Sequence, residues 1–324
     1  MVCRATRMVL AAVMTLGHTR LRLARGLESG EWDGFASRAL SSAWGAIASR
    51  SLARPLVLPA KGRVIAVGGA TLGGSGKTPL AIACALEIAR GGERVVFVAH
   101  GYGAKPGAAP RVVRADDDVA IVGDEALVAS RALRDAAPVV VARTRQAAID
   151  HAAPFADVLV LDGVLQTAPR RASLSLLALD ASAPWGTGHA PPRGDLRAPR
   201  HALIAAVDRV VVVHAVSRGA HLADRLLAWP ELAPLRIGLF VALARPSRIL
   251  QSLARHGVTP SAVVASADHV SPSPRAFASA EVDLWLASPK CATHLEAAHI
   301  PHATLDHDVI LDESLCAALR GGSG

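Results

Sequence analysis

Aromatic side chains are scarce in this 324-residue chain, since phenylalanine, tryptophan and tyrosine together make up only 3% of it. No stretch alternates basic and aromatic residues, as a surface that stacks nucleic-acid bases would. The formal net charge is nevertheless +8, and nearly all of the positive charge is arginine. We therefore expect anionic partners of another kind, namely nucleotides or an anionic membrane face, and no nucleic acid.

Cysteine is also sparse, and its spacing forms no known pattern. Cys3, Cys84, Cys291 and Cys316 lie far apart, and no C-x-x-C pair occurs. This spacing argues against a zinc site and against a disulfide framework. We expect reduced thiols in a protein that faces the cytosol.

Long apolar runs are missing as well. The segment Met8–Leu16 has nine consecutive apolar or small residues, whereas a membrane-spanning helix needs about 20. This run resembles the hydrophobic region of a signal peptide, but no A-x-A-like cleavage site follows it closely. A second candidate helix covers residues 36–54, where Leu40, Trp44 and Ile47 share one helical face among several arginines. Two interpretations stay open, a helix in a membrane interface or a helix packed on the core.

From residue 63 onward, short apolar runs alternate with alanine-rich segments of helical length. Continuous apolar strands separated by helices are typical of an α/β fold, with a parallel sheet covered by helices on both faces. We expect strands at 64–67, 95–98, 139–141, 157–162, 174–179 and 210–213, and a helix at 79–90. Strands at 237–242 and 282–287, with a helix at 246–256 between them, indicate a second, smaller α/β domain.

The strongest motif is a glycine-rich loop between the first of these strands and the first helix. Backbone N–H groups of such a loop converge with the N-terminus of the helix on one point and cradle phosphate. Lys77 would reach the terminal phosphates of ATP, and the Thr78 hydroxyl would bind Mg²⁺. A glycine-rich turn without a ligand is the alternative, and the intact Lys-Thr pair favours nucleotide binding. The predicted nucleotide-binding residues are Thr71, Gly73, Gly74, Ser75, Gly76, Lys77 and Thr78.

Four acidic residues, at three places in the chain, are candidates for the chemistry. Asp162 ends an apolar strand, as a Walker-B aspartate that holds Mg²⁺ does, although a simple turn aspartate before Gly163 is the alternative. Asp124 and Glu125 start an alanine-rich helix, either as helix caps or as a general base and a metal contact. The pattern leaves that choice open. Asp268-His269 is a pair of a kind that is usually structural.

These residues together resemble the tetraacyldisaccharide 4'-kinase family, the lipid A 4'-kinases of Gram-negative bacteria. Residues 67–79 (VGGATLGGSGKTP) resemble the family's V-G-N-x-T-x-G-G-T-G-K-T-P, including the threonine at position 71. Residues 100–103 (HGYG) resemble R-G-Y-G, and residues 122–126 (VGDEA) resemble V-G-D-E-P. Residues 192–199 (PRGDLRAP) are similar to P-x-G-P-L-R-E-P, residues 244–246 to A-R-P, and residues 267–269 (ADH) to P-D-H. The matches follow the family's order over roughly residues 36–290.

The resemblance implies transfer of the ATP γ-phosphoryl group to the 4'-hydroxyl of a tetraacylated glucosamine disaccharide 1-phosphate in lipid A biosynthesis. It implies a catalytic base formed by Asp124 with His269, a catalytic Lys77, and a metal region formed by Thr78, Asp162 and Glu125. It also implies peripheral attachment to the cytoplasmic side of the bacterial inner membrane, through a helix that best matches residues 36–54.

The resemblance also suggests how the chain is divided. We expect an N-terminal extension at 1–35, an amphipathic membrane-associating helix region at 36–60, a P-loop kinase domain at 61–224 and a smaller C-terminal α/β domain at 225–324.

Several positions depart from the family pattern. The family's D-D-G-F-Q-H is Leu161-Asp162-Gly163-Val164-Leu165-Gln166-Thr167 here, so that leucine replaces one of two paired aspartates. His100 stands for the arginine of R-G-Y-G, and Gly69 for the asparagine of V-G-N. Two alternatives follow. One is a P-loop kinase that acts on another acceptor. The other is a catalytically weakened nucleotide-binding regulatory or scaffold homologue, which the loss of an aspartate at Leu161 favours.

Overall fold

The structure is a computed structural model that describes residues 26–101, 104–242, 246–266, 272–278 and 280–321. Its described residues form two compact units. Residues 26–215 and 308–321 form the first, which we call the P-loop unit, and residues 216–307 form the second unit. Of the predicted N-terminal extension, residues 1–25 lie outside the described part of the chain.

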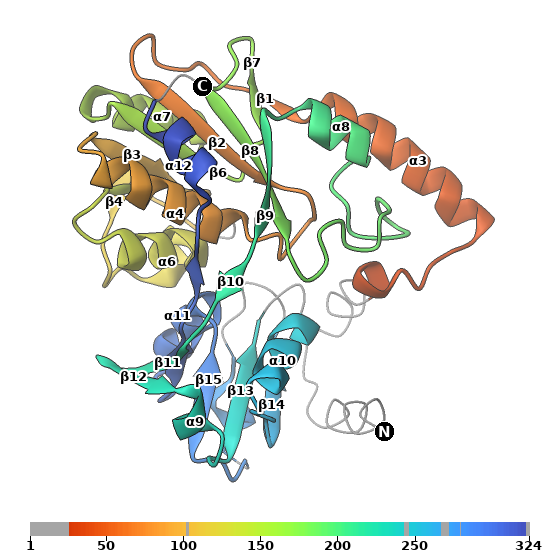
Figure 1. Ribbon diagram of the computed structural model, residues 1–324, viewed down its shortest axis with the longest axis vertical. Helices are drawn as coiled ribbons and strands as arrows, with labels where there is room; N and C mark the ends of the chain where they lie inside the picture. The colour runs from red at the N-terminus through yellow and green to blue at the C-terminus, as the bar shows by residue number, and fades with distance from the viewer. Residues whose placement is uncertain (1–25, 102–103, 243–245, 267–271, 279, 322–324) are drawn as a thin grey trace. The chain divides into compact units, whose positions relative to one another are not determined.

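A seven-stranded sheet is the centre of the P-loop unit (Figure 1). All neighbouring strands are parallel except β4 and β5. The predicted strands are confirmed, because their unbroken apolar runs suit strands that are buried on both faces. The strand order is β4 (Arg111–Val113), β5 (Val139–Val141), β3 (Val95–Val98), β6 (Val158–Asp162), β2 (Arg63–Gly69), β8 (Leu174–Asp180) and β9 (Arg209–Val213).

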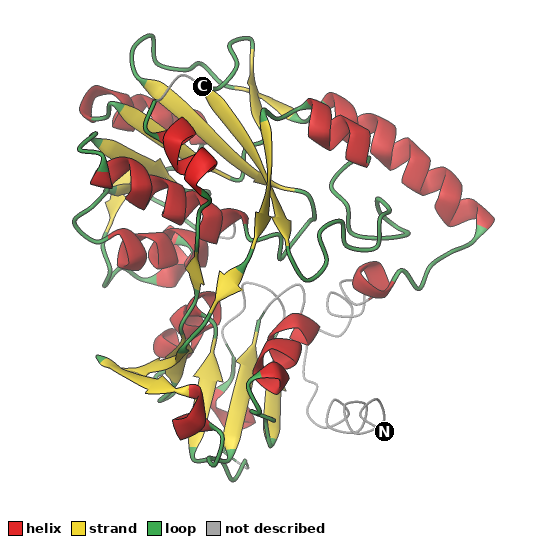
Figure 2. Cartoon of the chain, viewed as in Figure 1, coloured by secondary structure: helices red, strands yellow, loops and turns green. Residues whose placement is uncertain are grey.

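Helices cover both faces of this sheet, as predicted (Figure 2). One apolar core joins the sheet to α4 (Lys77–Arg90), α6 (Asp124–Leu133) and α12 (Glu313–Leu319). The opposite face packs on α7 (Arg145–Ala152), and further along on α8 (Arg200–Ala205) and the end of α3 (Phe35–Arg50). The unit also contains β1 (Ala53–Pro55), which pairs with β7 (Gln166–Ala168), a short α5 (Val119–Val122) and η1 (Ala153–Phe155).

The second unit contains a six-stranded sheet of its own. Four strands are parallel, whereas β11 is antiparallel to both of its neighbours. The strand order is β12 (Arg225–Ala228), β11 (Gly219–Leu222), β16 (Ala303–Leu305), β15 (Leu284–Ala287), β13 (Ile237–Val241) and β14 (Ala262–Ala265). The helices are α9 (Trp229–Leu232), α10 (Pro246–Arg255), η2 (Pro274–Ala276) and α11 (Pro289–Ala297).

The units divide the chain differently from the boundary expected at residue 225. The second unit starts at residue 216 and therefore includes β11, and residues 308–321 return to the P-loop unit. The return has a physical cause, since Leu315 and Leu319 are fully buried in the core around α4. Arg320 also donates through Nε to Glu87 of α4 at 2.9 Å. Strand β10 (Ala215–Val216) pairs with β17 (Asp308–Val309) in a small two-stranded sheet.

Helix α3 buries a narrow face of small residues rather than its large apolar ones. Ser41 and Gly45 are buried, and the Ser41 hydroxyl donates to the carbonyl of Ala190 at 2.7 Å. By contrast, Leu40 and Ile47 are 60% and 69% exposed. The interpretation of this segment as a helix with its apolar face on the core was therefore wrong. Among the described residues, no helix is both long enough and apolar enough to cross a membrane.

We predict that Leu319→Ala destabilises the protein by about 2–5 kcal/mol, because it opens a cavity between α12 and the P-loop helix. Ile310→Ala is the matched control, since Ile310 is 72% exposed and its truncation costs less than about 0.5 kcal/mol. Urea unfolding followed by circular dichroism measures both. Equal effects of the two substitutions would show that α12 does not belong to this core.

Candidate nucleotide and phosphoryl-transfer site

The glycine-rich loop joins the end of β2 to the start of α4 and depends on left-handed backbone. Gly74 and Gly76 have φ values of 65° and 78°, and Gly76 is the N-cap residue of α4. Residues with a Cβ rarely adopt this conformation, so glycine is required at both positions. The Thr71 hydroxyl donates to the carbonyl of Gly73 at 2.7 Å and thereby closes the turn. The resulting loop directs backbone N–H groups and a helix N-terminus to one point, which is a binding site for phosphate.

Close packing inside the loop explains one departure from the family pattern. A Cβ atom on Gly69 would lie 2.8 Å from the Cβ of Ser75, closer than real side chains approach. Ser75 is itself buried, with 4% of its surface exposed. Glycine at position 69 therefore leaves the space that Ser75 fills in this chain.

Four predicted residues meet in one hydrogen-bonded cluster. The ammonium group of Lys77 lies 2.6 Å from a carboxylate oxygen of Glu125, and it donates to the Thr78 hydroxyl at 3.2 Å. The Thr78 hydroxyl donates in turn to Oδ2 of Asp162 at 2.7 Å. Parallel pairing sets Asp162 beside Val67, so the end of β6 faces the start of the loop. Sequence reasoning predicted all four residues, and their geometry joins the loop, β6 and α6.

Asp162 is fully buried, and its second oxygen shows what the cluster can bind. Burial raises the pKa of Asp162, against the opposing effect of the positive charge of Lys77. Its Oδ1 atom has no hydrogen-bond partner among the described residues. A buried carboxylate oxygen beside a threonine hydroxyl fits Mg²⁺, which prefers oxygen ligands and is usually held by one or two carboxylates plus substrate phosphates. The residues present therefore fit the predicted ion.

The two residues predicted to form the catalytic base differ in how far the structure describes them. Asp124 is the first residue of α6 and is 2% exposed. Its Oδ1 accepts a hydrogen bond from the backbone N–H of Glu125 at 2.7 Å. Its position beside Glu125 brings it to the margin of the cluster around Lys77. His269 lies outside the described residues.

Leu161 points to the opposite face of the sheet from Asp162. It pairs in register with Ala66, whereas Asp162 pairs with Val67, and side chains alternate along a strand. Leu161 is fully buried in the apolar core formed with α7. In this chain position 161 is therefore a core position and not part of the group around Lys77 and Thr78.

Sequence reasoning missed a group of basic residues at the same edge of the sheet. Arg145 begins α7, directly after β5, and donates to the backbone carbonyl of Asp162. Burial lowers the pKa of Arg145 to about 10. Arg197 donates through Nε to the carbonyl of Gly69 at 3.2 Å. A search for basic residues just after the carboxyl ends of the strands would have found Arg145, because parallel strands end at one edge.

His100 follows β3 at this edge and stands where the family pattern has arginine. His100 is exposed overall, but partial burial of its ring, followed by the positive charge of Arg145, lowers its pKa to about 4 against the opposing charge of Glu125. The imidazole is therefore neutral near pH 7, and histidine does not supply the charge of the arginine. Arg54 and Arg145 lie close enough to act on it electrostatically.

Comparisons with known proteins identify the family of this chain. Residues 37–303 match the profile of the family described as LpxK, tetraacyldisaccharide-1-P 4'-kinase. The chain belongs to this tetraacyldisaccharide-1-P 4'-kinase family. It is 37% identical over 243 residues to the tetraacyldisaccharide 4'-kinase of Methylobacterium sp. (strain 4-46), which covers 70% of this chain and 72% of that protein. It is 34% identical over 239 residues to the tetraacyldisaccharide 4'-kinase of Paramagnetospirillum magneticum, and this alignment covers 69% of this chain and 70% of that protein.

A solved member of the tetraacyldisaccharide-1-P 4'-kinase family has the same fold. The crystal structure of LpxK from Aquifex aeolicus in complex with ATP aligns with a TM-score of 0.66 at 20% identity. The alignment covers 87% of this chain and 96% of that protein. The family resemblance and the predicted P-loop fold class are thereby confirmed.

We predict that Leu161→Asp destabilises the protein by about 3 kcal/mol or more and does not raise its activity, because the new carboxyl group enters an apolar core without a partner. Leu161→Met, which keeps the volume, costs less than about 1.5 kcal/mol. Urea unfolding and ATP turnover of both variants measure this. A stable Leu161→Asp protein with faster turnover would contradict the assignment of position 161 to the core.

Proposed function

We propose that this chain transfers the γ-phosphoryl group of ATP to the 4'-hydroxyl of a tetraacylated glucosamine disaccharide 1-phosphate, a step in the biosynthesis of lipid A. The observation that carries the proposal is the cluster of Lys77, Thr78, Asp162 and Glu125 at the glycine-rich loop. A chain of the tetraacyldisaccharide-1-P 4'-kinase family that keeps this cluster has the groups that phosphoryl transfer requires.

The nucleotide binds through residues 71–78. Backbone N–H groups of Gly73, Gly74, Ser75 and Gly76 hold the phosphates, and Thr71 keeps the loop closed by its hydrogen bond to Gly73. Lys77 exchanges part of its contact with Glu125 for the terminal phosphates, whose charge it balances. The exchange is favourable because a triphosphate carries more negative charge than one carboxylate.

Thr78 and Asp162 are the ligands that we assign to Mg²⁺, and Glu125, which contacts Lys77, adds a further carboxylate to the same region. Mg²⁺ held by these residues would supply positive charge against the negative charge that develops on the phosphates during transfer. The fully buried Asp162 is held in one orientation by Thr78 and by the surrounding core. Such a fixed carboxylate needs little reorganisation during the reaction.

We assign the role of general base to Asp124, with His269 as its partner. A carboxylate near the cluster accepts the proton of the sugar hydroxyl as the hydroxyl attacks the γ-phosphorus. Asp124 stands at the N-terminus of α6, and its Oδ1 accepts a hydrogen bond from the backbone N–H of Glu125.

The acceptor's acyl chains suggest where the enzyme works. Helix α3 exposes Leu40, Trp44 and Ile47 on one face, and Phe35 at its start is 91% exposed. Apolar side chains of this kind on a helix with flanking arginines suit the interface of an anionic membrane. We therefore propose that the protein lies peripherally on the cytoplasmic side of the bacterial inner membrane, with α3 in the interface.

We favour a kinase over the scaffold alternative, because Leu161 packs in the core with α7 while Asp162 keeps its contact with Thr78. A kinase with a different, soluble acceptor remains the competing proposal. It differs from ours in predicting no role for the exposed apolar face of α3.

We predict that label from γ-labelled ATP appears at the 4'-position of the disaccharide 1-phosphate when both are incubated with the protein in detergent micelles. Lys77→Ala lowers kcat/KM by about a hundredfold or more, since it removes a charge that stabilises the transition state. Chelation of Mg²⁺ abolishes transfer. Lys61→Ala is the control, because Lys61 is an exposed lysine outside the loop. Labelled inorganic phosphate without labelled lipid would sink the proposal.

We predict that the protein sediments with vesicles of phosphatidylglycerol and phosphatidylethanolamine, and that Ile47→Glu weakens this binding about tenfold. The reason is the loss of one buried apolar side chain and the entry of a charge into the interface. Ala46→Glu adds the same charge beside the exposed apolar face of α3 and leaves binding within about threefold. If both variants bind as the parent does, α3 is not the membrane contact.

A further inference from the structure

Residues 70–72, at the start of the glycine-rich loop, pair with a part of the chain that lies far away in the sequence, residues 195–197. The backbone N–H of Leu72 donates to the carbonyl of Asp195 at 2.9 Å. A second backbone hydrogen bond, of 2.8 Å, joins the other ends of the two segments, and an antiparallel bridge lies between the two bonds. The backbone just before Gly73 is therefore held by residues outside the loop.

The carboxylate of Asp195 folds this partner segment, residues 187–197, back on itself. Its Oδ1 accepts a hydrogen bond from the backbone N–H of Thr187 at 3.2 Å. Asp195 is 5% exposed, so its side chain contacts protein rather than solvent. The same residue thus contacts Thr187 through its side chain and Leu72 through its backbone carbonyl.

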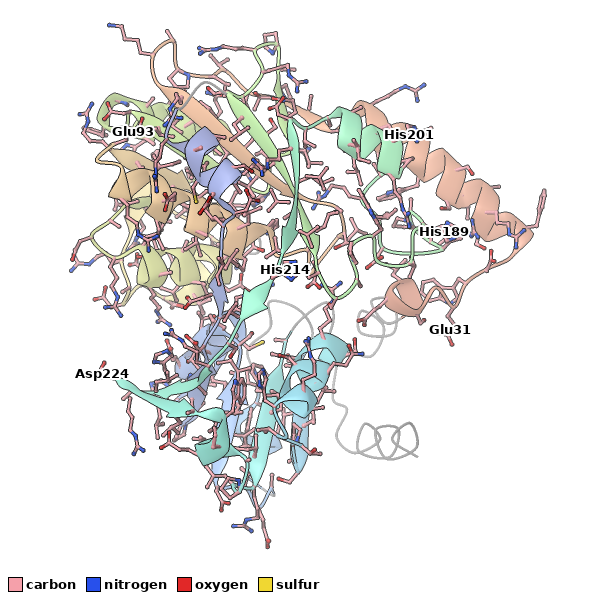
Figure 3. All side chains as sticks on the ribbon, viewed as in Figure 1. Glu31, Glu93, His189, His201, His214 and Asp224 are labelled. Atoms are coloured by element: carbon pink, nitrogen blue, oxygen red, sulfur yellow. The ribbon has the colours of Figure 1, made fainter. Side chains whose placement is uncertain are left out.

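A backbone contact at His189, which Figure 3 labels, closes the 187–197 segment further. The carbonyl of His189 accepts a hydrogen bond from the N–H of Leu196 at 2.9 Å. Glycine is required at position 194, because an added Cβ would lie 2.6 Å from the carbonyl oxygen of His189. The segment therefore has one tight conformation, which sets where residues 195–197 meet the glycine-rich loop.

Helix α3 fixes the same segment at two further points. The Ser41 hydroxyl donates to the carbonyl of Ala190 at 2.7 Å. Nε of Arg193 lies 3.0 Å from Oδ1 of Asp33, just before α3. The 187–197 segment is thus attached to α3 as well as to the start of the glycine-rich loop.

A loop that binds phosphate through backbone N–H groups binds best when it already has its binding conformation. Each residue that becomes ordered only on binding costs backbone conformational entropy, and this cost lowers the affinity. Pairing of residues 70–72 lets the turn start from a fixed backbone. Thr71 extends the constraint into the turn through its hydrogen bond to the carbonyl of Gly73.

We propose that Asp195 is a positioning residue for the nucleotide, because its carboxylate folds the 187–197 segment into the conformation that holds the start of the glycine-rich loop. The proposal rests on the proposed function, in which residues 71–78 bind the phosphates of ATP. The family pattern P-x-G-P-L-R-E-P has proline at this position, and proline carries no side-chain acceptor. The contact between the carboxylate and Thr187 is therefore a property of this chain rather than of the family pattern.

Titration calorimetry with the Mg²⁺ complex of a non-hydrolysable ATP analogue tests the proposal. We expect Asp195→Ala to weaken binding about tenfold, because the segment loses a hydrogen bond to a charged acceptor and the loop becomes less ordered. Asp195→Asn keeps an acceptor oxygen and stays within about threefold of the parent. Asp208→Ala is the matched control and stays within about twofold. Its carboxylate accepts the backbone N–H of Ser175 at 2.7 Å, at the start of β8 and so at the opposite edge of the sheet.

Hydrogen exchange of the Leu72 amide gives a readout that needs no nucleotide. Its protection falls about tenfold in Asp195→Ala and stays at the parent's level in Asp195→Asn and Asp208→Ala.

Parent-like affinity and protection in Asp195→Ala would overturn the proposal. Equal losses in Asp208→Ala would reveal a general loss of stability and overturn it too, and so would an Asp195→Asn variant that behaves like Asp195→Ala. A chain that binds the nucleotide and shows the expected losses, but transfers no phosphate to the lipid, would instead contradict the proposed function and keep this inference.

Discussion

A carboxylate that is fully buried at the end of the central strand organises this site. Asp162 has no solvent around it, so its charge depends on the hydrogen bond from Thr78 and on the ammonium group of Lys77, 4.0 Å from its Oδ2. A buried charge without such partners costs several kcal/mol. Residues 77 and 78 can reach Asp162 because β2 and β6 pair in parallel and in register, so that the loop leaves β2 beside the end of β6.

The two faces of the sheet have different surroundings at this edge. On the face of α4, the loop, Lys77 and Glu125 form an environment for a nucleotide and its metal ion. On the other face, the same strand ends border a pocket with Arg54 and Arg197, next to a helix whose large apolar side chains face solvent.

Much of the fold, and the glycine-rich loop with Lys77 and Thr78, could be predicted from local sequence. The apolar runs 158–161 and 64–67 predicted buried parallel strands, and the glycines with Lys77 and Thr78 predicted the loop, because short-range geometry decides both. Tertiary packing decided what the sequence could not. The role of Leu161 depends on strand register, which sets it in the core with α7, and the return of α12 depends on where Leu319 is buried. The pocket that Arg54 and Arg197 line joins segments about 140 residues apart, and no local sequence pattern predicts it.

The central claim is that the loop and Asp162 together hold a metal–nucleotide complex. Titration calorimetry with a non-hydrolysable ATP analogue, with and without Mg²⁺, tests it most directly in the parent and in Asp162→Asn. We predict saturable binding that weakens about tenfold or more when Mg²⁺ is withheld, and a smaller dependence on Mg²⁺ in Asp162→Asn. No binding at all, or an affinity that is indifferent to both Mg²⁺ and Asp162, would contradict it.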